Sequence, residues 1–144
     1  MNRSKLREII IKVLYQKYIY DSKNIDYNLE NLVKEQLDTK NDFVIDAVIN
    51  INKNQEKLNK IANKHMKDWN IERLSKVDKA IISLGIYELL FTDTPNIVAI
   101  NEAIELAKLY SDEKVVKMIN GILDNIMHSE ETNDWQILNS KSNK

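Results

Sequence analysis

The chain contains no cysteine, one proline and two glycines among its 144 residues. Without cysteine it has no disulfides, thiolate metal sites or thiol nucleophiles, which fits a reducing cytoplasm. So little glycine excludes phosphate-binding loops and sheets built on tight hairpins, because those backbones need residues at positive φ. No run reaches the roughly 18 apolar residues of a membrane span, and the N-terminus does not resemble a signal peptide. These absences leave an all-helical, cytoplasmic domain.

The positive charge of the chain is gathered at its N-terminal end. The formal net charge is −1, yet residues 1–18 carry five Lys or Arg and one Glu, a net charge of +4, which leaves −5 for the remainder. The small total excludes the overall basic signature of many nucleic-acid-binding proteins. It still allows a local basic contact on an otherwise acidic chain.

Apolar residues recur at steps of three and four along most of the chain, which predicts amphipathic helices. The expected helices run approximately over residues 6–20, 29–37, 42–65, 75–91, 101–110 and 113–127. The fourth of these is apolar almost all round, so it is expected at the centre of the domain. From residue 129 onward the chain is polar and without periodicity. We therefore predict one domain over residues 1–128, followed by a flexible tail over residues 129–144.

Several residues predict where these helices begin, end or cross. Ser75 followed by Asp78 resembles a capping box with the shorter acid, and Asn101 is the expected N-cap of the fifth helix. The polar stretch 52–57 is expected to be an exposed part of one continuous helix. Gly121 lies inside the last helix at a cost of about 1 kcal/mol relative to alanine, which predicts that another helix crosses closely there.

The sequence contains no recognisable catalytic or metal site. The two histidines, His65 and His128, are isolated and belong to no Glu-x-x-His or His-Glu-x-x-His arrangement. His65 follows the apolar rhythm of its helix, which is typical of a hydrogen-bonded boundary residue, and His128 is expected as a cation at a helix C-terminus. Without a nucleophile, a phosphate loop or a ligand cluster, we expect a binding protein that needs no cofactor and no metal.

The first helix carries a candidate edge for RNA. Arg7, Ile11 and Tyr15 advance by four residues each, so a guanidinium and a phenol lie along one side. Arginine can make forked contacts to phosphate, and a tyrosine ring offers a stacking surface to an unpaired base. The alternative interpretation is that the cations of residues 1–18 are the solvated face of an ordinary amphipathic helix.

The second half of the chain resembles the NusB family of bacterial transcription antitermination factors. The resemblance rests on WNIERLSKVDKAIISLGIYELLFTDTPNIVAINEAIELAKLYSDEKVVKMINGILDNI, and on the N-terminal LREIIIKVLYQ, which is similar to the family's Ala-Arg-Glu and Ala-Leu-Tyr pattern. It covers nearly all of residues 3–127, although residues 20–66 match mainly in pattern.

The resemblance implies an all-α fold of two helical subbundles, with about six to seven helices and no catalysis. It implies binding to single-stranded boxA-like RNA of ribosomal RNA leader transcripts, together with a NusE-type small-subunit ribosomal protein, in a complex on RNA polymerase. The residues that match the family's RNA surface are Arg3, Lys5, Arg7, Tyr15, Lys114, Lys117 and Met118. Those that match the side meeting the ribosomal protein are Asp78, Tyr87, Glu88 and Glu102. Tyr87 and Glu102 also fit plainer roles, in the core and at a helix start.

The chain departs from the family pattern at both ends of the expected RNA surface. Ser4 interrupts what is usually a run of arginines, and Val115 and Met118 stand where a Ser-x-Lys-Phe pattern would place a hydroxyl and an aromatic ring. These departures motivate the alternative of a protein-interaction module that has lost RNA binding. A homodimer is also open, since some family members pair through their RNA surface. The targeting domain of an RNA methyltransferase is disfavoured, because 144 residues with two glycines leave no room for a cofactor fold.

Trp69 is expected to pack at the junction of the two helical halves.

Overall fold

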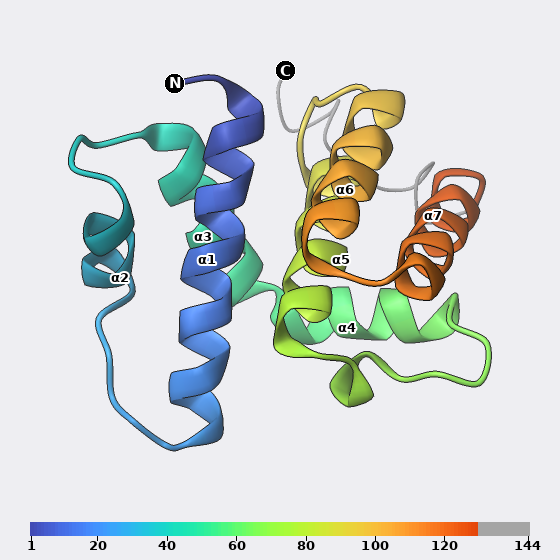
Figure 1. The fold of residues 1–144 in the computed structure, drawn as a ribbon, viewed down its shortest axis with the longest axis horizontal. Helices are drawn as coiled ribbons and strands as arrows, with labels where there is room; N and C mark the ends of the chain where they lie inside the picture. The colour runs from blue at the N-terminus through green and yellow to red at the C-terminus, as the bar shows by residue number, and fades with distance from the viewer. Residues whose placement is uncertain (130–144) are drawn as a thin grey trace. The chain divides into compact units, whose positions relative to one another are not determined.

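The structure, a computed structural model, describes residues 1–129 of the chain (Figure 1). Within those residues it contains seven α-helices, one short 3-10 helix and no strand, which confirms the all-α prediction. The elements are α1 (Arg3–Ser22), α2 (Leu29–Gln36), α3 (Asp42–Lys53), α4 (Gln55–Lys64), η1 (Ile71–Arg73), α5 (Lys76–Phe91), α6 (Asn96–Tyr110) and α7 (Glu113–Met127). The predicted tail lies, apart from Ser129, outside the described residues.

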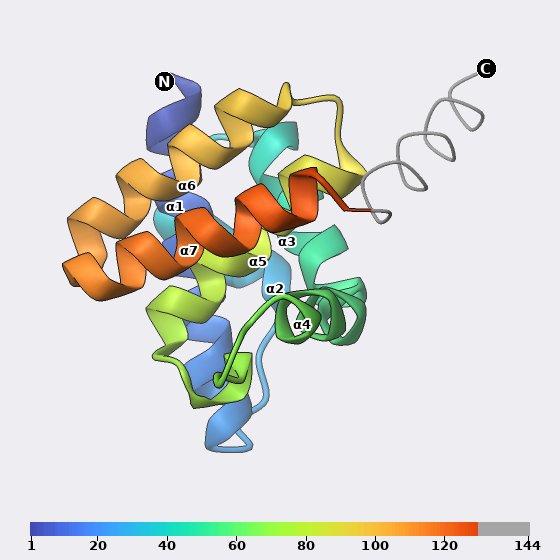
Figure 2. The same cartoon turned by 90° about the vertical axis from the view of Figure 1, so that its right-hand side faces the viewer.

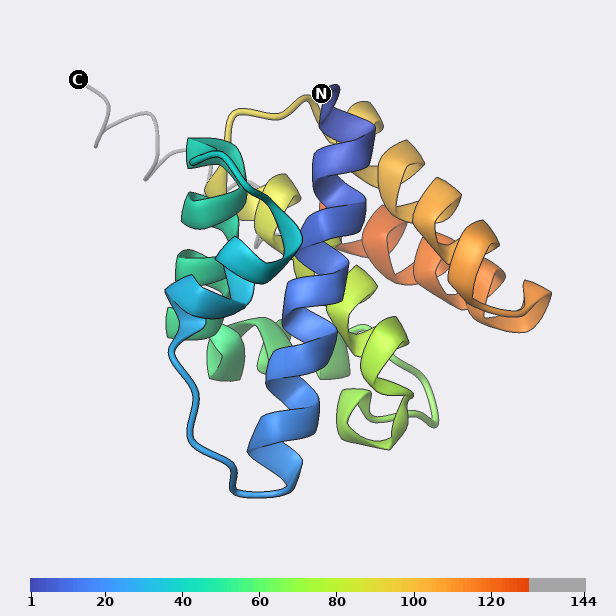
Figure 3. The same ribbon diagram turned by 60° about the vertical axis from the view of Figure 1, so that its left-hand side comes forward.

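The helices form two compact units that meet in sequence between Asn54 and Gln55. In the first unit α1 packs against both α2 and α3, as Figure 3 shows. Polar side chains cap these helices: Asn2 Oδ1 accepts from the Lys5 N–H at 2.9 Å, and Asn41 Oδ1 accepts from the Val44 N–H at 3.1 Å. These caps satisfy N–H groups that a helix start leaves without a partner.

The second unit is built around α5. This helix packs against α4, α6 and α7, and α6 and α7 also pack against each other (Figure 2). Every residue from Ala80 to Leu90 is buried. The prediction of a central, almost wholly apolar helix is therefore confirmed.

The prediction of one continuous helix over residues 42–65 is wrong, because the chain breaks at Asn54 into α3 and α4. The Asn54 side-chain amide and backbone N–H both donate to the Asn50 carbonyl, at 2.8 and 3.0 Å, and end α3. The polar stretch 52–57 contributes no buried side chain, so packing does not hold a helix straight through it. The weakly apolar segment is thus where one unit ends and the other begins.

The fifth predicted helix begins earlier than expected. The structure starts α6 at Asn96, with the Pro95 carbonyl accepting from the N–H groups of Val98 and Ala99, both at 3.0 Å. Proline suits a helix start because its φ is already helical and its missing N–H is not needed there. Asn101 is consequently an exposed residue within α6, and its predicted role as the N-cap is wrong.

The close helix crossing also lies elsewhere than predicted. A Cβ added to Gly121 would meet nothing within 4 Å, so no helix crosses there. A Cβ added to Gly85 on α5 would lie 2.9 Å from Leu123 Cδ1 on α7 and 3.4 Å from Ala103 Cβ on α6. Gly85, and not Gly121, is the glycine that lets α5, α6 and α7 approach one another.

The positions of the two histidines agree with those predicted from the sequence. His128 is the C-cap residue of α7, and its Nδ1 lies 2.9 Å from the Asp124 carbonyl. His65 follows α4 and is half-buried, as a boundary residue would be. No helix within residues 1–129 is long and apolar enough to cross a membrane.

Candidate RNA-binding surface

The N-terminal turn of α1 presents two exposed cations. The Arg3 guanidinium carbon lies 4.0 Å from the centroid of the Phe43 ring on α3, within the range of a cation–π contact. Lys5 Nζ lies 3.3 Å from Glu8 Oε2 on the next turn, and the lysine side chain of this pair is exposed. A surface pair of this kind contributes little stability, so Lys5 remains able to contact phosphate. The ring of Phe43 holds the arginine without neutralising it.

The predicted edge along Arg7, Ile11 and Tyr15 is only partly open. Arg7 is 4% exposed and Ile11 is also buried, so the structure does not present Arg7 on the open edge that the spacing predicted. Its guanidinium carbon lies 5.5 Å from the centroid of the Phe43 ring. Tyr15 is 41% exposed and can offer its ring to a base. In this conformation Arg7 packs beneath the surface, and its role in RNA binding remains a prediction.

A buried cation at the other end of α1 has a structural role. Lys17 Nζ lies 2.6 Å from Asp21 Oδ2, and the Tyr27 hydroxyl donates to Asp21 Oδ1 at 2.7 Å. Tyr27 also stacks on Tyr20, with ring centroids 5.9 Å apart. Burial, together with the hydrogen bond to Asp21 and its negative charge, raises the pKa of the Tyr27 phenol well above its ordinary value. This network fixes the turn between α1 and α2.

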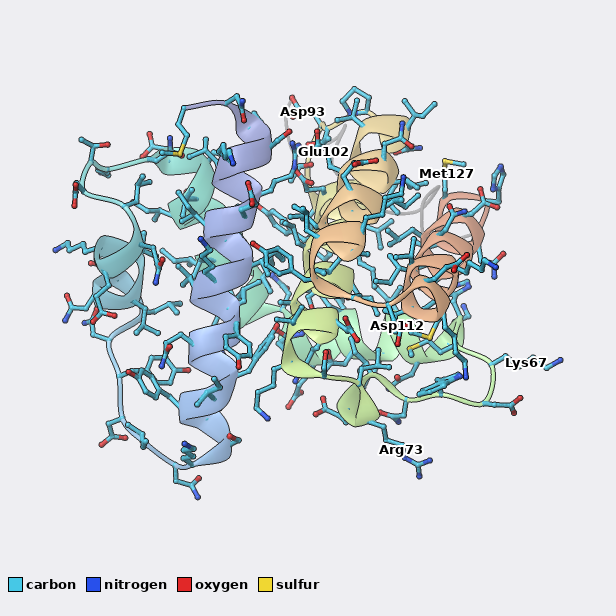
Figure 4. All side chains as sticks on the ribbon, in the orientation of Figure 1. Lys67, Arg73, Asp93, Glu102, Asp112 and Met127 are labelled. Carbon is cyan, nitrogen blue, oxygen red and sulfur yellow. The ribbon has the colours of Figure 1, made fainter. Side chains whose placement is uncertain are left out.

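The first turn of α7 carries the second group of predicted RNA contacts. Asp112 caps the helix, its Oδ1 accepting from the Val115 N–H at 2.9 Å. Lys114 and Lys117 are exposed, and Lys117 Nζ lies 3.8 Å from Glu113 Oε1 in a pair that is open to solvent. Figure 4 shows Asp112 at the turn between α6 and α7. The helix start therefore presents two cations that weak surface pairing leaves accessible.

Trp69 lies beside Lys114, and its ring is exposed instead of packed away as predicted. It is 45% exposed, and Lys114 Nζ lies 5.4 Å from its ring centroid. The ring lines a hollow of about 270 Å³ whose other walls come from the chain before α5 and from the start of α7. The lining residues are Trp69, Leu74, Asp112, Lys114, Val115 and Met118.

Asp78 helps to hold this region in place. The Ser75 hydroxyl oxygen accepts from the Asp78 N–H at 3.1 Å, as a capping box requires, but the Asp78 carboxylate does not return to Ser75. It accepts instead from the hydroxyl of Ser111, the residue before the α7 cap. Only half of the predicted capping box forms, because the carboxylate of this 8% exposed residue is engaged with the turn between α6 and α7.

The residues expected to meet a protein partner are mostly buried. Tyr87 is 7% exposed and stacks on Phe91 with centroids 6.1 Å apart, and Glu88 is 1% exposed. Glu102 is half-buried on α6, where Figure 4 labels it. A partner could touch Glu102 directly, whereas Asp78, Tyr87 and Glu88 can only shape the surface above them. Their role in partner binding remains a prediction.

Trp69 is not among the site residues predicted from the sequence. Large aromatic residues are usually buried, which favours a packing role for a tryptophan. Three polar residues, Lys67, Asp68 and Asn70, flank the tryptophan in the sequence. Such residues favour solvent, so they are the signal that could have indicated an exposed ring. Figure 4 shows Lys67 and Arg73, on the chain between α4 and α5, pointing away from the helices. Within residues 1–129 no three acidic, histidine or cysteine residues are grouped to hold a metal.

Comparison with known proteins places the chain in one family. A profile of the NusB family matches residues 4–128. Transcription antitermination protein NusB of Clostridium kluyveri is 41% identical, over 90% of this chain and 97% of that protein. Transcription antitermination protein NusB of Pediococcus pentosaceus is 38% identical, over 88% of this chain and 97% of that protein.

Solved structures agree with the sequence relatives. The structure of T. maritima NusB matches with a TM-score of 0.78 at 31% identity, covering 93% of this chain and 96% of that one. A chain from the structure of antitermination factors NusB and NusE in complex with dsRNA matches with a TM-score of 0.72 at 28% identity, covering 88% and 96%. The family is non-enzymatic, which agrees with the prediction of a binding protein. The chain therefore belongs to the NusB family of transcription antitermination factors.

Proposed function

We propose that this chain binds boxA-type RNA of ribosomal RNA leader transcripts, together with a NusE-type small-subunit ribosomal protein, within an antitermination complex on RNA polymerase in the cytoplasm. The observation that carries the proposal is the exposure of cations at two helix starts, Arg3 and Lys5 on α1 and Lys114 and Lys117 on α7. Both pairs are at positions that match the RNA surface of the family. A related chain of known structure is found with NusE and RNA, which supports the choice of partners.

The exposed cations can bind a single strand of RNA without reading its sequence. Arg3 offers forked donors to a phosphate, and each lysine offers a compact charge that displaces counterions from the backbone. Sequence preference requires contacts to the bases, which in single-stranded RNA come from stacking and from hydrogen bonds to exposed base edges. The exposed ring of Tyr15 supplies one such stacking surface on the first unit.

The charge distribution predicts that a protein partner raises the affinity of the chain for RNA. The chain beyond residue 18 carries a net charge of −5, which repels RNA. A ribosomal protein that covers acidic surface and adds basic surface would raise RNA affinity without any change in the chain itself. We therefore expect weak RNA binding by the chain alone and tight binding by the pair.

The proposal is tested by fluorescence anisotropy with a boxA-like single-stranded RNA and a scrambled RNA of the same length. The titrations use the full chain, with and without its NusE-type ribosomal protein, and the double variant Arg3→Glu/Lys5→Glu. Lys23→Glu, an exposed cation at the opposite end of α1, is the matched control. We expect selective binding that tightens with the partner, falls at least about tenfold in the double variant, and stays near wild type in the control.

Two results would contradict this function. Equal, feeble binding to both RNAs with intact binding to the ribosomal protein would identify the chain as a protein-interaction module. An equal loss in Lys23→Glu and in the double variant would show that only overall charge matters. Pairing of two copies is measured separately by sedimentation over a concentration series, where a single monomeric species throughout would reject a homodimer.

A further inference from the structure

We propose that the Trp69 ring is a stacking platform for one unpaired base of the bound RNA, with Lys114 beside it as the contact to the adjoining phosphate. The proposal rests on the function proposed above and assigns it a base-contacting residue. It concerns the second unit only, where the chain before α5 meets the start of α7. The hollow of about 270 Å³ beside the ring is the space that the base enters.

The exposure of Trp69 is the first observation behind this proposal. Nearly half of this side chain is open to solvent, although burying an indole would contribute several times the stabilisation of burying a methyl group. The ring of a nucleobase is flat and of similar size, and stacking on an aromatic side chain is insensitive to which base is present. An open indole at the mouth of an apolar hollow has the shape and the chemistry for such a base.

The segment that carries Trp69 is held on both sides. Met66 and Ile71 are buried, and the Ile71 N–H donates to Asn63 Oδ1 at 2.8 Å. Between them, just before the tryptophan, Asp68 adopts a left-handed backbone with φ of 63°. A ring that is already fixed loses little conformational freedom when a ligand arrives, so more of the contact energy appears as affinity.

Lys114 gives the platform its charge. Its ammonium lies 5.4 Å from the ring centroid, where it can also reach a phosphate next to a stacked base. The nearby acids are engaged in other contacts: Asp112 caps α7, and Glu113 lies 3.8 Å from Lys117. The site thus combines an aromatic face with an accessible cation, as single-strand binding sites do. The larger hollow between α2 and α3, about 520 Å³, has no aromatic lining and offers no equivalent surface.

The hollow also includes one of the positions at which the chain departs from the family pattern. Met118 stands where the family commonly has a phenylalanine, and this methionine lines the same hollow as Trp69. A flexible thioether packs against a base but provides no ring. Trp69, which belongs to the stretch of sequence that resembles the family, supplies an aromatic face in the same hollow.

The test uses tryptophan fluorescence and binding together. The sequence has two tryptophans, so Trp135→Phe leaves Trp69 as the single reporter in the full chain. We expect the Trp69 emission to be quenched on titration with the boxA-like RNA. We expect Trp69→Leu to lower affinity by about 5- to 100-fold and Trp69→Phe to lower it by less than about threefold. Tyr110→Leu, which removes another partly exposed ring of the second unit, is the control and should bind as wild type.

Abasic substitutions in the RNA identify the stacked base. Removing that one base should weaken binding to the wild type, but should weaken binding to Trp69→Leu no further. The inference is overturned if the wild type binds selectively, yet Trp69→Leu stays within about twofold of it and the emission does not change. It is also overturned if Trp69→Leu lowers only the affinity for the ribosomal protein, which would make the hollow a protein contact. Absence of selective RNA binding by the wild type would instead refute the proposed function itself.

Discussion

The two glycines of the chain show that the same residue type can have opposite structural roles. Gly85 is enclosed by Leu123 and Ala103, whereas Gly121 faces open space. Both lie inside helices, where glycine is unfavourable by about 1 kcal/mol relative to alanine. Gly85 is explained by the close packing of three helices, and Gly121 is not explained by packing at all.

Alanine substitution should therefore have opposite effects at the two positions. Gly121→Ala should raise the free energy of unfolding by up to about 1 kcal/mol, because it adds helix propensity without a clash. Gly85→Ala should lower it by about 1 kcal/mol, because overpacking against the buried Leu123 outweighs the propensity gain. Urea denaturation of both variants measures the difference. Equal stabilisation by the two alanines would show that α7 yields to the added methyl group.

The Tyr27 phenol predicts how stability changes at alkaline pH. Its pKa is raised in the folded state, so its contribution is fully present below the ordinary tyrosine pKa of about 10 and is lost as the pH rises above that value. In the unfolded chain the phenol ionises at its ordinary pKa, which favours unfolding. We expect the free energy of unfolding of the wild type to fall more steeply above about pH 10 than that of Tyr27→Phe. Parallel curves for the two proteins in thermal or urea unfolding would contradict this assignment.

At the scale of the elements, the contact between Asp78 and Ser111 ties α5 to the turn that precedes α7. The sequence resemblance placed Asp78 on a partner surface, and the structure shows a buried carboxylate that holds a neighbouring turn. These interpretations predict different measurements, because a fixed turn affects stability whether or not a partner is present.

Asp78→Ala should lower the free energy of unfolding by about 1 to 3 kcal/mol, since it leaves the Ser111 hydroxyl without this acceptor. Ser111→Ala should be destabilising as well, and the double variant should cost less than the sum of the two. A double-mutant cycle in urea measures the coupling. Unchanged stability in Asp78→Ala, together with weaker binding of the ribosomal protein, would instead support a role for Asp78 in partner binding.

At the scale of the whole molecule, the small net charge predicts a modest salt dependence. Four exposed cations are assigned to RNA phosphates, and each phosphate neutralised on a single strand contributes a slope of about −0.7 to log K against log salt. We expect a slope of about −3 for the chain alone. Anisotropy titrations over a series of KCl concentrations measure it. A slope near zero would reject phosphate contacts at Arg3, Lys5, Lys114 and Lys117. A much steeper slope would show that further cations contact the RNA.

Much of the fold could be predicted from periodicity, because the apolar spacing that forms a helix is local. The buried positions of α1, the cap at Ser75 and the apolar character of α5 all follow from neighbours within one or two turns. The break at Asn54 and the start of α6 at Pro95 could not be placed correctly, since each depends on where packing ends. The cations at the starts of α1 and α7 could be identified from the sequence, whereas the exposure of Trp69 could not.

The sequence by itself determined the helical class, the positions of most helices and the separation of a basic start from an acidic remainder, because spacing and charge are properties of the chain order. The tertiary structure alone decided which charged residues are accessible: Arg7, Asp78 and Glu88 are buried, whereas Arg3, Lys5 and Lys114 are exposed. It also brought Trp69 beside Lys114, although 45 residues separate them in the sequence. Burial and proximity of this kind depend on how distant segments pack, and no local pattern records them.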